Sequence, residues 1–492
     1  MKLETIIGLE IHVQLKTRSK MFCSCSNDGE NQPPNTTICP VCLGHPGTLP
    51  VPNKQAIEWA VKAALAINCR IPAHSKFDRK HYFYPDLPKG YQISQLDEPV
   101  GTKGWIEVLV SGEQRRIRIH RLHLEEDAAK LIHSKKGESF VDYNRGGTPL
   151  MEIVTEADIR SPKEAGEFLR ELRLTMRYLG VSSADMEKGH LRCDANVSLR
   201  PEGDSEFYSK TEIKNLNSFK AVERALEYEI KRQTAVWEET GKAPQKQGTR
   251  GWDEDALKTV EQRSKEGSAD YRYFPEPDIP ELNFDKAWIE TIRASIPELP
   301  NQLRERFAAD YGFNTADAKI FSQDRALAEF AENTVSELKL WLTSTEEEGT
   351  ASDIWDKHKE KLAKLVSSWI LTKLLGLLNA RGMSVKDLLV TPENMAELIT
   401  LVYERKVNGM NAQLVLEEMF LHGKDPSDIL EEKDLGQLGD LSEVGAIIDE
   451  VISENSSQVE EFKAGKEQVA NFLVGMVMKK SKGKADAAEV RE

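Results

Sequence analysis

The first residues with a chemically suggestive spacing are Glu10 and His12, a carboxylate and an imidazole two positions apart. They interrupt the apolar residues of 4–15, ETIIGLEIHVQL, in the alternation that is typical of a half-buried β-strand. Side chains two positions apart in a strand share a face and lie about 6–7 Å apart. Such a pair can share a metal ion or a proton. Taken alone, the pair is better explained as the solvated face of an ordinary strand.

Two further segments alternate in the same way and carry an acidic residue on the polar face. In 148–156, TPLMEIVTE, Glu152 lies opposite the apolar side chains, and in 191–200, LRCDANVSLR, Asp194 does so. These segments predict strands of one antiparallel sheet that direct carboxylates onto one surface.

A third segment, 115–127, RRIRIHRLHLEED, adds Glu125 to this set. If the strand stays extended, its alternation places Ile117 and Ile119 in phase with His123 and Glu125. Carboxylates collected on one face need a cation beside them, and an oxygen-rich set fits Mg²⁺ or Mn²⁺. An imidazole among the ligands favours Mn²⁺ slightly. Unrelated exposed strands are the alternative.

Four of the six cysteines form two closely spaced pairs with a loop between them. The pairs are Cys23 with Cys25, and Cys39 with Cys42. Two such pairs match the spacing of a tetrahedral zinc site, and disulfides are the weaker alternative in a cytosolic chain. Since all four ligand positions are cysteines, no position is open for water, and the predicted Zn²⁺ is structural.

Length and composition predict a soluble protein of two to four domains. The chain has 492 residues, 39% of them hydrophobic and 30% charged, and a net charge of −15. The negative charge argues against binding nucleic acid through overall charge, but RNA can still be held by shape or by a local basic patch. No apolar run approaches a membrane span, and the N-terminus lacks a signal-peptide pattern, so we expect a cytoplasmic protein without membrane contact.

The pattern changes along the chain from strands to helices. Residues 1–293 are rich in strand and turn signals, and the pattern from 294 onward is helical. We therefore predict an α+β protein: an antiparallel-sheet domain in 1–293, an all-α helical domain in 294–404 and a small helical tail domain in 405–492.

Two polar segments are candidates for contacts with phosphate groups. Asn215, Asn217 and Ser218 precede a helix that we expect to begin near Phe219, and a helix N-terminus can bind an anion. The last helix runs into the basic residues Lys479, Lys480, Lys482 and Lys484. A solvated tail and an RNA-phosphate contact explain these lysines equally well. The chain has no P-loop or G-x-G-x-x-G sequence, so any ATP site must be of an unusual kind.

Taken together and in this order, several motifs resemble the B subunit of bacterial aspartyl/glutamyl-tRNA amidotransferases. They are GLEIHVQL, CPVCLGHPGTLPVPN, RKHYFYPDLPKGYQISQ, HLEEDAAK, DYNRGGTPLMEIVTE, RCDANVSLR, EIKNLNSF and DYRYFPEPD. The resemblance covers almost the whole chain. It implies a cradle domain in 1–293, a helical domain in 294–404 and a tRNA-binding tail in 405–492.

The family resemblance also implies an activity and partners. The B subunit phosphorylates the side-chain carboxylate of Glu-tRNA(Gln) or Asp-tRNA(Asn) with ATP. Ammonia, released from glutamine by an amidase A subunit, then replaces the phosphate to give Gln-tRNA(Gln) or Asn-tRNA(Asn). A small C subunit joins A and B in a heterotrimer. Phosphoryl transfer depends mainly on positioning and on charge neutralisation, which metal ions supply.

The resemblance and the predicted strand faces together assign Glu10, His12, Glu125 and Glu152 to a Mg²⁺ or Mn²⁺ site. Asp194 is a predicted neighbour. Glu125 is also a candidate acceptor of the ammonia proton, and Lys89 is a candidate for the channel mouth or for a phosphate contact. The family zinc site maps onto the four clustered cysteines.

Two alternatives belong to other functional classes. One is a zinc-stabilised tRNA-binding adaptor that positions substrate for another enzyme. The other is a free-standing metal hydrolase, against which the missing nucleophile motif and the tail domain argue.

Overall fold

The computed structural model describes residues 2–134, 136–244, 247–262, 271–341, 350–436, 441–481, 484–485 and 489–491. The chain divides into two compact units, Met1–Pro300 and Asn301–Glu492. The first unit combines sheets and helices, and the described residues of the second are helical, which confirms the predicted α+β class. The border between the units lies close to the predicted domain boundary at 293.

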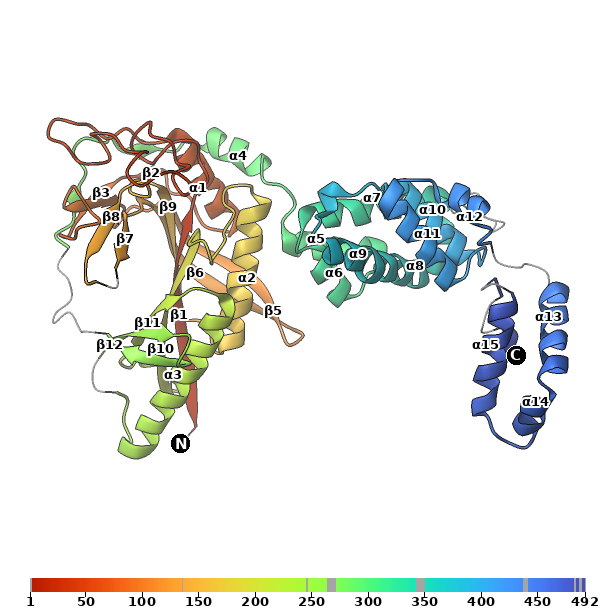
Figure 1. Cartoon of the computed structure of the whole chain (residues 1–492). Helices are drawn as coiled ribbons and strands as arrows, with labels where there is room; N and C mark the ends of the chain where they lie inside the picture. The colour runs from red at the N-terminus through yellow and green to blue at the C-terminus, as the bar shows by residue number, and fades with distance from the viewer. Residues whose placement is uncertain are drawn as a thin grey trace. The chain divides into compact units, whose positions relative to one another are not determined.

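An eight-stranded sheet is the central element of the first unit (Figure 1). Its strand order is β13-β12-β11-β10-β1-β9-β6-β5. All neighbouring strands are antiparallel except β11 and β12, which are parallel. The strands are β1 (Leu3–Gln14), β5 (Gly101–Val110), β6 (Glu113–Glu126), β9 (Pro149–Thr155), β10 (Leu191–Pro201), β11 (Thr211–Leu216), β12 (Gly248–Asp253) and β13 (Lys258–Glu261).

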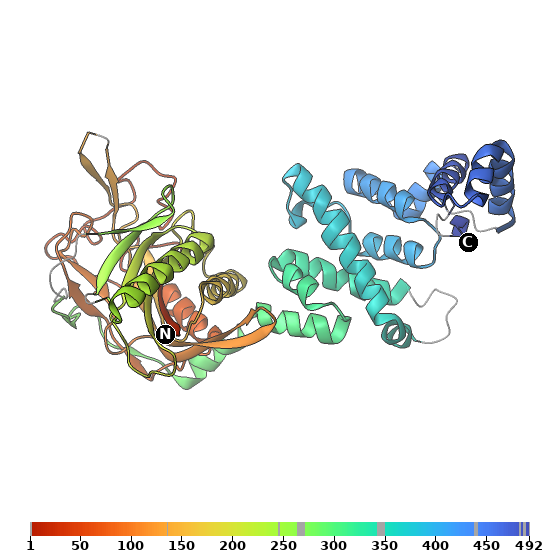
Figure 2. The same cartoon turned by 90° about the horizontal axis from the view of Figure 1, so that it is seen from below.

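Three helices contribute to the hydrophobic core on one side of this sheet. They are α1 (Lys54–Ala66), α2 (Pro162–Tyr178) and α3 (Phe219–Thr240), and α2 and α3 lie along each other and against the sheet (Figures 1 and 2). The alternate apolar residues of β1, such as Ile7 and Ile11, are fully buried in this core. Because side chains alternate along a strand, Glu10 and His12 lie on the other face.

Three short strands, β3, β4 and β14, pair with one another beside the eight-stranded sheet. β4 (Tyr91–Ser94) pairs with β3 (Asp78–His81), which also pairs with β14 (Phe274–Pro275). β4 lies beside β6: the backbone N–H of Leu124 donates to Gln95 Oε1, and the N–H of Ile93 donates to Glu126 Oε1, both at 3.0 Å. The remaining elements of this unit are β2 (His74–Ser75), β7 (Lys130–His133), β8 (Ser139–Asp142), β15 (Leu282–Asn283) and α4 (Lys286–Ala294).

The helices of the second unit follow the sequence signals closely. Gly423, with φ 63°, ends α11, and the side chain of Asp425 caps the start of α12, where Pro426 follows. The helices are α5 (Pro300–Tyr311), α6 (Thr315–Phe321), α7 (Arg325–Trp341), α8 (Ala351–Ser367), the π-helical η2 (Ser368–Leu374), α9 (Leu375–Arg381), α10 (Pro392–Tyr403), α11 (Gly409–His422), α12 (Pro426–Lys433), α13 (Leu441–Glu454), α14 (Ser456–Lys463) and α15 (Gln468–Lys480), with short 3₁₀ turns at Val385–Asp387 and Glu489–Arg491.

The second unit contains a separate small core near the C-terminus. Val444, Val451, Val477 and Ala485 are buried together there. α10 contacts both α11 and α12 across the predicted boundary at 405. The division at 404/405 therefore stays a prediction, and a change in packing occurs nearer residue 440.

One helical stretch of the described residues, Trp355–Arg381, is long and apolar enough to cross a membrane by length and composition. A core helix of a soluble protein passes the same test. Leu362, Val366 and Ile370 on this stretch are fully buried within the unit. Their burial favours a core helix over a membrane span.

Candidate metal centre and active site

The four strands that carry the predicted acidic residues are adjacent in the sheet, in the order β10, β1, β9, β6. Glu10 pairs across the strands with Asp194, and His12 pairs with Glu152. Glu152 in turn pairs with His123 of β6. The tertiary structure therefore gathers distant residues onto one patch of the sheet. Glu10 and Asp194, for example, are 184 residues apart in the sequence.

Two imidazoles and two carboxylates alternate at the centre of this patch. His12 Nε2 lies 3.4 Å from Glu152 Oε2 and 3.6 Å from Glu125 Oε1. His123 Nε2 lies 3.5 Å from both Glu125 Oε2 and Glu152 Oε2. We call these four residues, together with Glu10, the His–Glu cluster.

A β-bulge sets the orientation of β6 in this cluster. The pairing of β6 with β9 shifts between Ile119 and Arg121, so that His120 is an extra residue. The buried core side chains of β6 are Ile117, Ile119, Leu122 and Leu124. His123 and Glu125 lie on the opposite face, toward the cluster. The sequence-based phase, with Ile117 and Ile119 on the face of His123 and Glu125, is therefore wrong, because a regular alternation does not allow for the bulge.

The electrostatics of the cluster follow from the mixture of acids and imidazoles. Burial by itself would lower the pKa of His12, but the hydrogen bond with Glu152 and the charge of Glu125 outweigh it and raise that pKa. Burial would raise the pKa of Glu125, yet its hydrogen bond with His123 and the charge of His12 hold it below its usual value. The two carboxylates therefore favour the ionised state in which a cation can bind.

Glu10 differs from these two carboxylates, because its pKa lies above the usual value. Burial raises the pKa of Glu10, and the charge of Glu152 raises it further. Across β10, the carboxylate of Asp194 accepts a hydrogen bond at 2.7 Å from the ammonium of Lys214. Glu10 is thus an acidic ligand that a bound cation would stabilise, and Asp194 is a neighbour already paired with a lysine.

The donor set of the cluster fits a hard divalent cation. Glu10, His12 and Glu152 form one group whose ligand atoms lie within 4.8 Å of one another. His123, Glu125 and Glu152 form a second such group. Carboxylate oxygens suit Mg²⁺, and the imidazoles extend the fit to Mn²⁺. Either group, sharing Glu152, can hold such an ion.

Further polar residues surround the cluster. Ser94 Oγ donates to Glu125 Oε2 at 3.0 Å, and Arg121 Nη2 lies 3.4 Å from Glu152 Oε1. Lys80 Nζ lies 4.9 Å from the ring centre of Tyr271. Burial would lower the pKa of Lys80, but the surrounding charges, chiefly that of Glu125, together outweigh it and raise that pKa. The cluster therefore has a lysine close by that stays charged.

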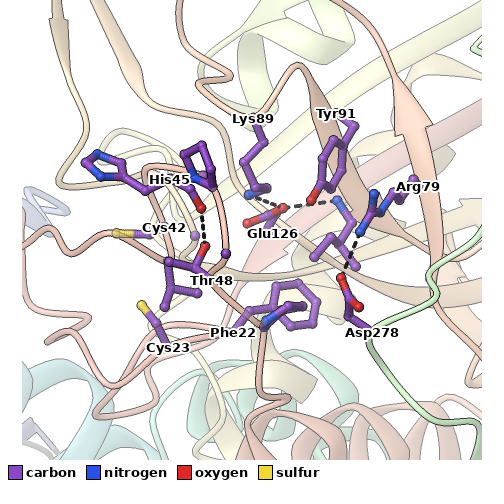
Figure 3. Close-up of a pocket in the computed structure, with 17 residues that line it drawn as sticks. Phe22, Cys23, Cys42, His45, Thr48, Arg79, Lys89, Tyr91, Glu126 and Asp278 are labelled. Carbon is purple, nitrogen blue, oxygen red and sulfur yellow. Dashed lines mark hydrogen bonds and ion pairs between the residues drawn. The ribbon is translucent and has the colours of Figure 1, made fainter.

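Lys89 lines a cavity of about 220 Å³ that Glu126 also borders (Figure 3). Its Nζ lies 2.6 Å from Glu126 Oε1, next in sequence to Glu125. Gly44, which also lines the cavity, has φ 66°, and a Cβ added there would lie 2.5 Å from Lys89 Cγ. Only glycine allows this close approach, so the loop that carries Cys39 and Cys42 packs directly against Lys89.

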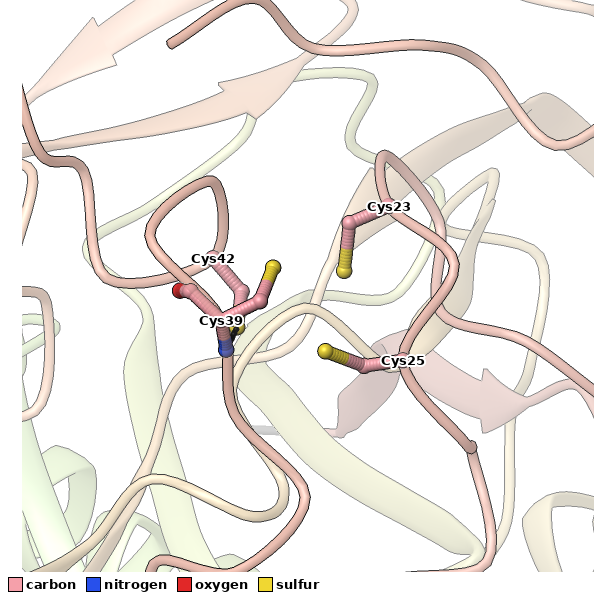
Figure 4. Close-up of side chains that lie close together, drawn as sticks. All are labelled: Cys23, Cys25, Cys39 and Cys42. Atoms are coloured by element: carbon pink, nitrogen blue, oxygen red, sulfur yellow. Dashed lines mark hydrogen bonds between the residues drawn. The ribbon is translucent and has the colours of Figure 1, made fainter.

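The four clustered cysteines converge as the spacing predicted (Figure 4). Their sulfur atoms all lie within 4.8 Å of one another, close to the separation of about 3.8 Å in tetrahedral zinc–thiolate sites. Hydrogen bonding from Cys23 lowers the pKa of Cys42 to about 5, although burial opposes it. The buried ammonium of Lys20 lies 4.0 Å from Cys42 Sγ and partly offsets thiolate charge. These residues fit a structural Zn²⁺.

The predicted ATP loop adopts the expected helix start. Ser218 is the N-cap of α3, and its hydroxyl accepts a hydrogen bond from the N–H of Ala221. Asn215 has φ 62° and is exposed, and Asn217 is also exposed. The Ser218 hydroxyl is thus already used for capping, while the two asparagine side chains remain at the surface.

The tail lysines differ in whether they already form ion pairs. Lys480 lies 2.7 Å from both Glu450 and Glu454, and Lys484 lies 2.6 Å from Asp434. Lys479 is exposed. Lys482 lies outside the described residues. Of the described three, Lys479 is therefore the best placed for a phosphate contact.

His123 and Lys214 are the site residues that the sequence interpretation did not select. His123 carries a detectable signal, because the H-x-E order of LHLEE mirrors the E-x-H order of GLEIHV. Lys214 carries none, since only the pairing of β11 with β10 brings it to Asp194. Lys80 belongs to a polar segment, 77–95, whose side chains suit contacts with phosphate and ribose groups.

Comparison with known proteins agrees with this geometry. Residues 5–290 match the model of the GatB/GatE catalytic domain, and residues 354–492 match that of the GatB domain. Three relatives are each named as the B subunit of an aspartyl/glutamyl-tRNA(Asn/Gln) amidotransferase. The chain is 46% identical to that of Carboxydothermus hydrogenoformans, over 99% of this chain and 97% of the relative. It is 47% identical to that of Brevibacillus brevis and 48% identical to that of Thermodesulfovibrio yellowstonii, each over 100% of this chain and 98% of the relative. The chain therefore belongs to the family of aspartyl/glutamyl-tRNA(Asn/Gln) amidotransferase B subunits.

Proposed function

We propose that this chain is the catalytic subunit that converts Glu-tRNA(Gln), Asp-tRNA(Asn) or both into Gln-tRNA(Gln) and Asn-tRNA(Asn). The observation that carries the proposal is the His–Glu cluster on four adjacent strands, in a chain whose family is shown along its full length. An adaptor that only positions tRNA has no need for several buried, like-charged carboxylates around one point.

The reaction has two steps, a phosphoryl transfer and an acyl transfer to ammonia. An oxygen of the substrate's side-chain carboxylate attacks the γ-phosphorus of ATP, the bond from phosphorus to ADP breaks, and an acyl phosphate forms. Ammonia nitrogen then bonds to the acyl carbon, the carbon–oxygen bond to phosphate breaks, and one ammonia proton is lost. We assign Glu125 as the acceptor of that proton, since its carboxylate lies in the His–Glu cluster beside the hydroxyl of Ser94.

Glu10, His12, His123, Glu125 and Glu152 would hold Mg²⁺ or Mn²⁺. When bound, such an ion neutralises the phosphate charge during transfer. The protein's own part is to hold the carboxylates in register through the strand pairing, and to keep Lys80 charged beside them. Lys214, bound to Asp194, and the exposed Asn215 and Asn217 lie on the β11 side, where we place the nucleotide.

We assign the cavity next to Lys89 to the arrival of ammonia. It borders Glu126, the sequence neighbour of Glu125, and its other wall is formed by the cysteine loops. The relatives are named as one subunit of an amidotransferase, which indicates a multi-subunit complex. We propose an amidase A subunit and a small C subunit as the partners in a cytoplasmic heterotrimer. Zn²⁺ on Cys23, Cys25, Cys39 and Cys42 would fix the cavity wall against Lys89.

The test uses Glu10→Ala and Glu125→Ala variants in the assembled complex, with Glu113→Ala as the control. Glu113 is an exposed carboxylate on the same strand as Glu125. We expect phosphate release that depends on ATP and Glu-tRNA to fall by at least about 100-fold in the two cluster variants and to stay unchanged in the control. Binding of tRNA should persist in all three. Full activity in both cluster variants would favour the adaptor over the enzyme.

A further inference from the structure

A second cavity, of about 420 Å³, shares no lining residue with the cavity at Lys89. Gln14 lines it, two residues along β1 from His12 and on the same face. Gln14 Nε2 donates to Asp127 Oδ2 at 2.7 Å, which fixes the side chain between the cluster and the cavity. The side chains of Gln14 and His12 are therefore about 6–7 Å apart along the strand, one repeat of its alternation.

Three lysines at this cavity, Lys16, Lys130 and Lys188, are exposed. Within the described part of the chain, no carboxylate forms an ion pair with any of them. The lysines nearer to the catalytic centre are different, because Lys89 is paired with Glu126 and Lys214 with Asp194. In a chain of net charge −15, three unpaired cations around one cavity are a local basic site.

The cavity also has rigid polar walls. Arg145 Nε donates to the carbonyl of Ala128 at 2.9 Å and its Nη2 to that of Ala129 at 2.7 Å, so the guanidinium plane is held in place. Asn27 Nδ2 donates to the carbonyl of Leu15, and Asn27 Oδ1 is buried without a partner among the described residues. A fixed guanidinium plane and a free acceptor suit a nucleotide base.

Two of the three carboxylates that line the cavity are occupied, and the third, Asp28, is exposed. Glu30 lies 3.1 Å from His190 Nε2, and His190 Nδ1 in turn lies 2.7 Å from Ser183 Oγ. Asp142 Oδ1 accepts hydrogen bonds from the backbone N–H groups of Asn35 and Asn144. These bonds use carboxylate oxygens that would otherwise repel an anionic ligand.

We propose that this cavity seats the 3′-terminal nucleotide of the aminoacylated RNA. Lys16, Lys130 and Lys188 bind its last phosphates, and Arg145 and Asn27 contact the base. The proposal rests on the function proposed above, and it adds the place from which the aminoacyl group enters. RNA ends are recognised in this way, by lysine contacts to phosphates and by base contacts in a pocket.

The distances agree with this placement. The amino acid is esterified to the terminal ribose, and five bonds of about 1.5 Å separate the ester oxygen from the side-chain carboxyl carbon of a glutamyl group, a span of about 6 Å. That span matches the step from Gln14 to His12 along β1. A ribose at the cavity edge therefore delivers the carboxylate to the His–Glu cluster.

A cross-linking experiment on the assembled complex tests the position of the RNA end. Periodate oxidation converts the terminal ribose of tRNA to a dialdehyde, which forms an imine with a nearby lysine amine by loss of water, and borohydride reduces the imine to a stable bond. We expect the linked peptides to contain Lys16, Lys130 or Lys188, with no product from unoxidised tRNA. Cross-links confined to other lysines would overturn the proposal.

A kinetic experiment tests the same lysines with an independent measurement. The variant Lys16→Ala/Lys130→Ala/Lys188→Ala should raise KM for Glu-tRNA by about tenfold or more, leave KM for ATP unchanged, and reduce the slope of log KM against log salt by about 2. Its melting temperature should not change, since the three side chains are exposed and unpaired. The matched control, Lys231→Ala/Lys258→Ala/Lys286→Ala, removes the same charge from exposed positions outside the cavity.

The outcomes distinguish a failure of the proposed function from a failure of the cavity proposal. If the wild-type complex releases no phosphate with ATP and Glu-tRNA, the proposed function fails. If the wild type is active and both triple variants have the same KM for Glu-tRNA, the proposed function stands and the cavity proposal is overturned.

Discussion

At the scale of single residues, the site depends on alternating acidic and imidazole groups within 3.4–3.6 Å of one another. Contacts with the histidines hold the pKa of Glu125 below its usual value against the effect of burial, and the carboxylates raise the pKa of His12 in return. A bound cation would take the place of the imidazole protons beside these carboxylates.

His123 should be a metal ligand of equal importance to His12. We expect His123→Ala to weaken Mn²⁺ binding by at least about tenfold, because one of the two ligand groups loses its imidazole. Titration of free Mn²⁺ by electron paramagnetic resonance measures this directly. His120→Ala is the control, since that exposed imidazole on the same strand pairs with Glu156. Equal Mn²⁺ affinity in both variants would exclude His123 from the site.

Removal of zinc should lower the melting temperature of the protein rather than its kcat. Cys39→Ser, or chelation of the wild type, should lower the melting temperature by about 5 °C or more, because the two cysteine loops lose their common ligand. The remaining folded protein should keep its kcat. Ser24→Ala, an exposed change between Cys23 and Cys25, should leave both quantities unchanged. A Cys39→Ser protein of normal stability but without activity would contradict a structural role.

At the scale of elements, β6 shows why the alternation of residues along a strand was not enough to predict which face each side chain occupies. The strands β1, β9 and β10 keep a regular alternation, and their polar faces were predictable from it. In β6 the bulge at His120 adds one residue, so a count from Ile117 assigns Glu125 to the wrong face. A bulge depends on pairing with a neighbouring strand, which a single segment does not reveal.

The helices of the second unit are linked by a carboxylate whose effect on stability depends on pH. Glu332 of α7 binds Arg306 and Tyr311 of α5, and the hydrogen bond from Arg306 holds the pKa of Glu332 below its usual value, against the effect of burial. Its contribution is therefore complete above the unfolded pKa of about 4.3 and is lost as the pH falls through the lower folded pKa.

We accordingly expect Glu332→Gln to lower the melting temperature by about 2 °C at pH 7. The difference from the wild type should shrink as the pH falls from 5 to 3, because the wild-type carboxylate then becomes neutral as well. Calorimetric scans of the full chain across this range measure it. A difference that stays constant over the range would show that the ionised state of Glu332 is irrelevant.

At the scale of the whole molecule, the His–Glu cluster, both cavities and the cysteine site all lie in the first unit. The second unit contributes helices, a separate core near the C-terminus and the exposed Lys479. This division predicts that catalysis and part of the tRNA affinity are separable.

A chain that ends at Gly436 should test this separation, since it keeps α11 and α12 with α10 and removes the last core. We expect its complex to bind tRNA at least about tenfold more weakly, while its ATP hydrolysis without tRNA stays the same. Filter binding and phosphate release measure the two quantities. Lys479→Ala in the full chain shows how much of the loss comes from that charge. Equal tRNA binding by the shortened chain would remove the tail from the recognition surface.

The sequence by itself determined the elements and the candidate ligands. Alternation fixed the faces of Glu10, His12 and Glu152, because a strand has only two faces, and cysteine spacing fixed the four thiols, because a tetrahedral ion needs them in two close pairs. Helix ends at Gly423 and Asp425 followed from local backbone chemistry.

Only the tertiary structure decided which strands are neighbours, how the bulge turns Glu125, and where Lys80 and Lys214 come to lie. These properties depend on pairings between separate segments of the chain, as between Ile119 and Thr155 or between Glu10 and Asp194, for which no local rule exists. The first strand of the chain thus indicated a possible site. The adjacent strands β1, β9 and β6 made it one, since the ligands of a group can meet a single ion only when their strands lie side by side.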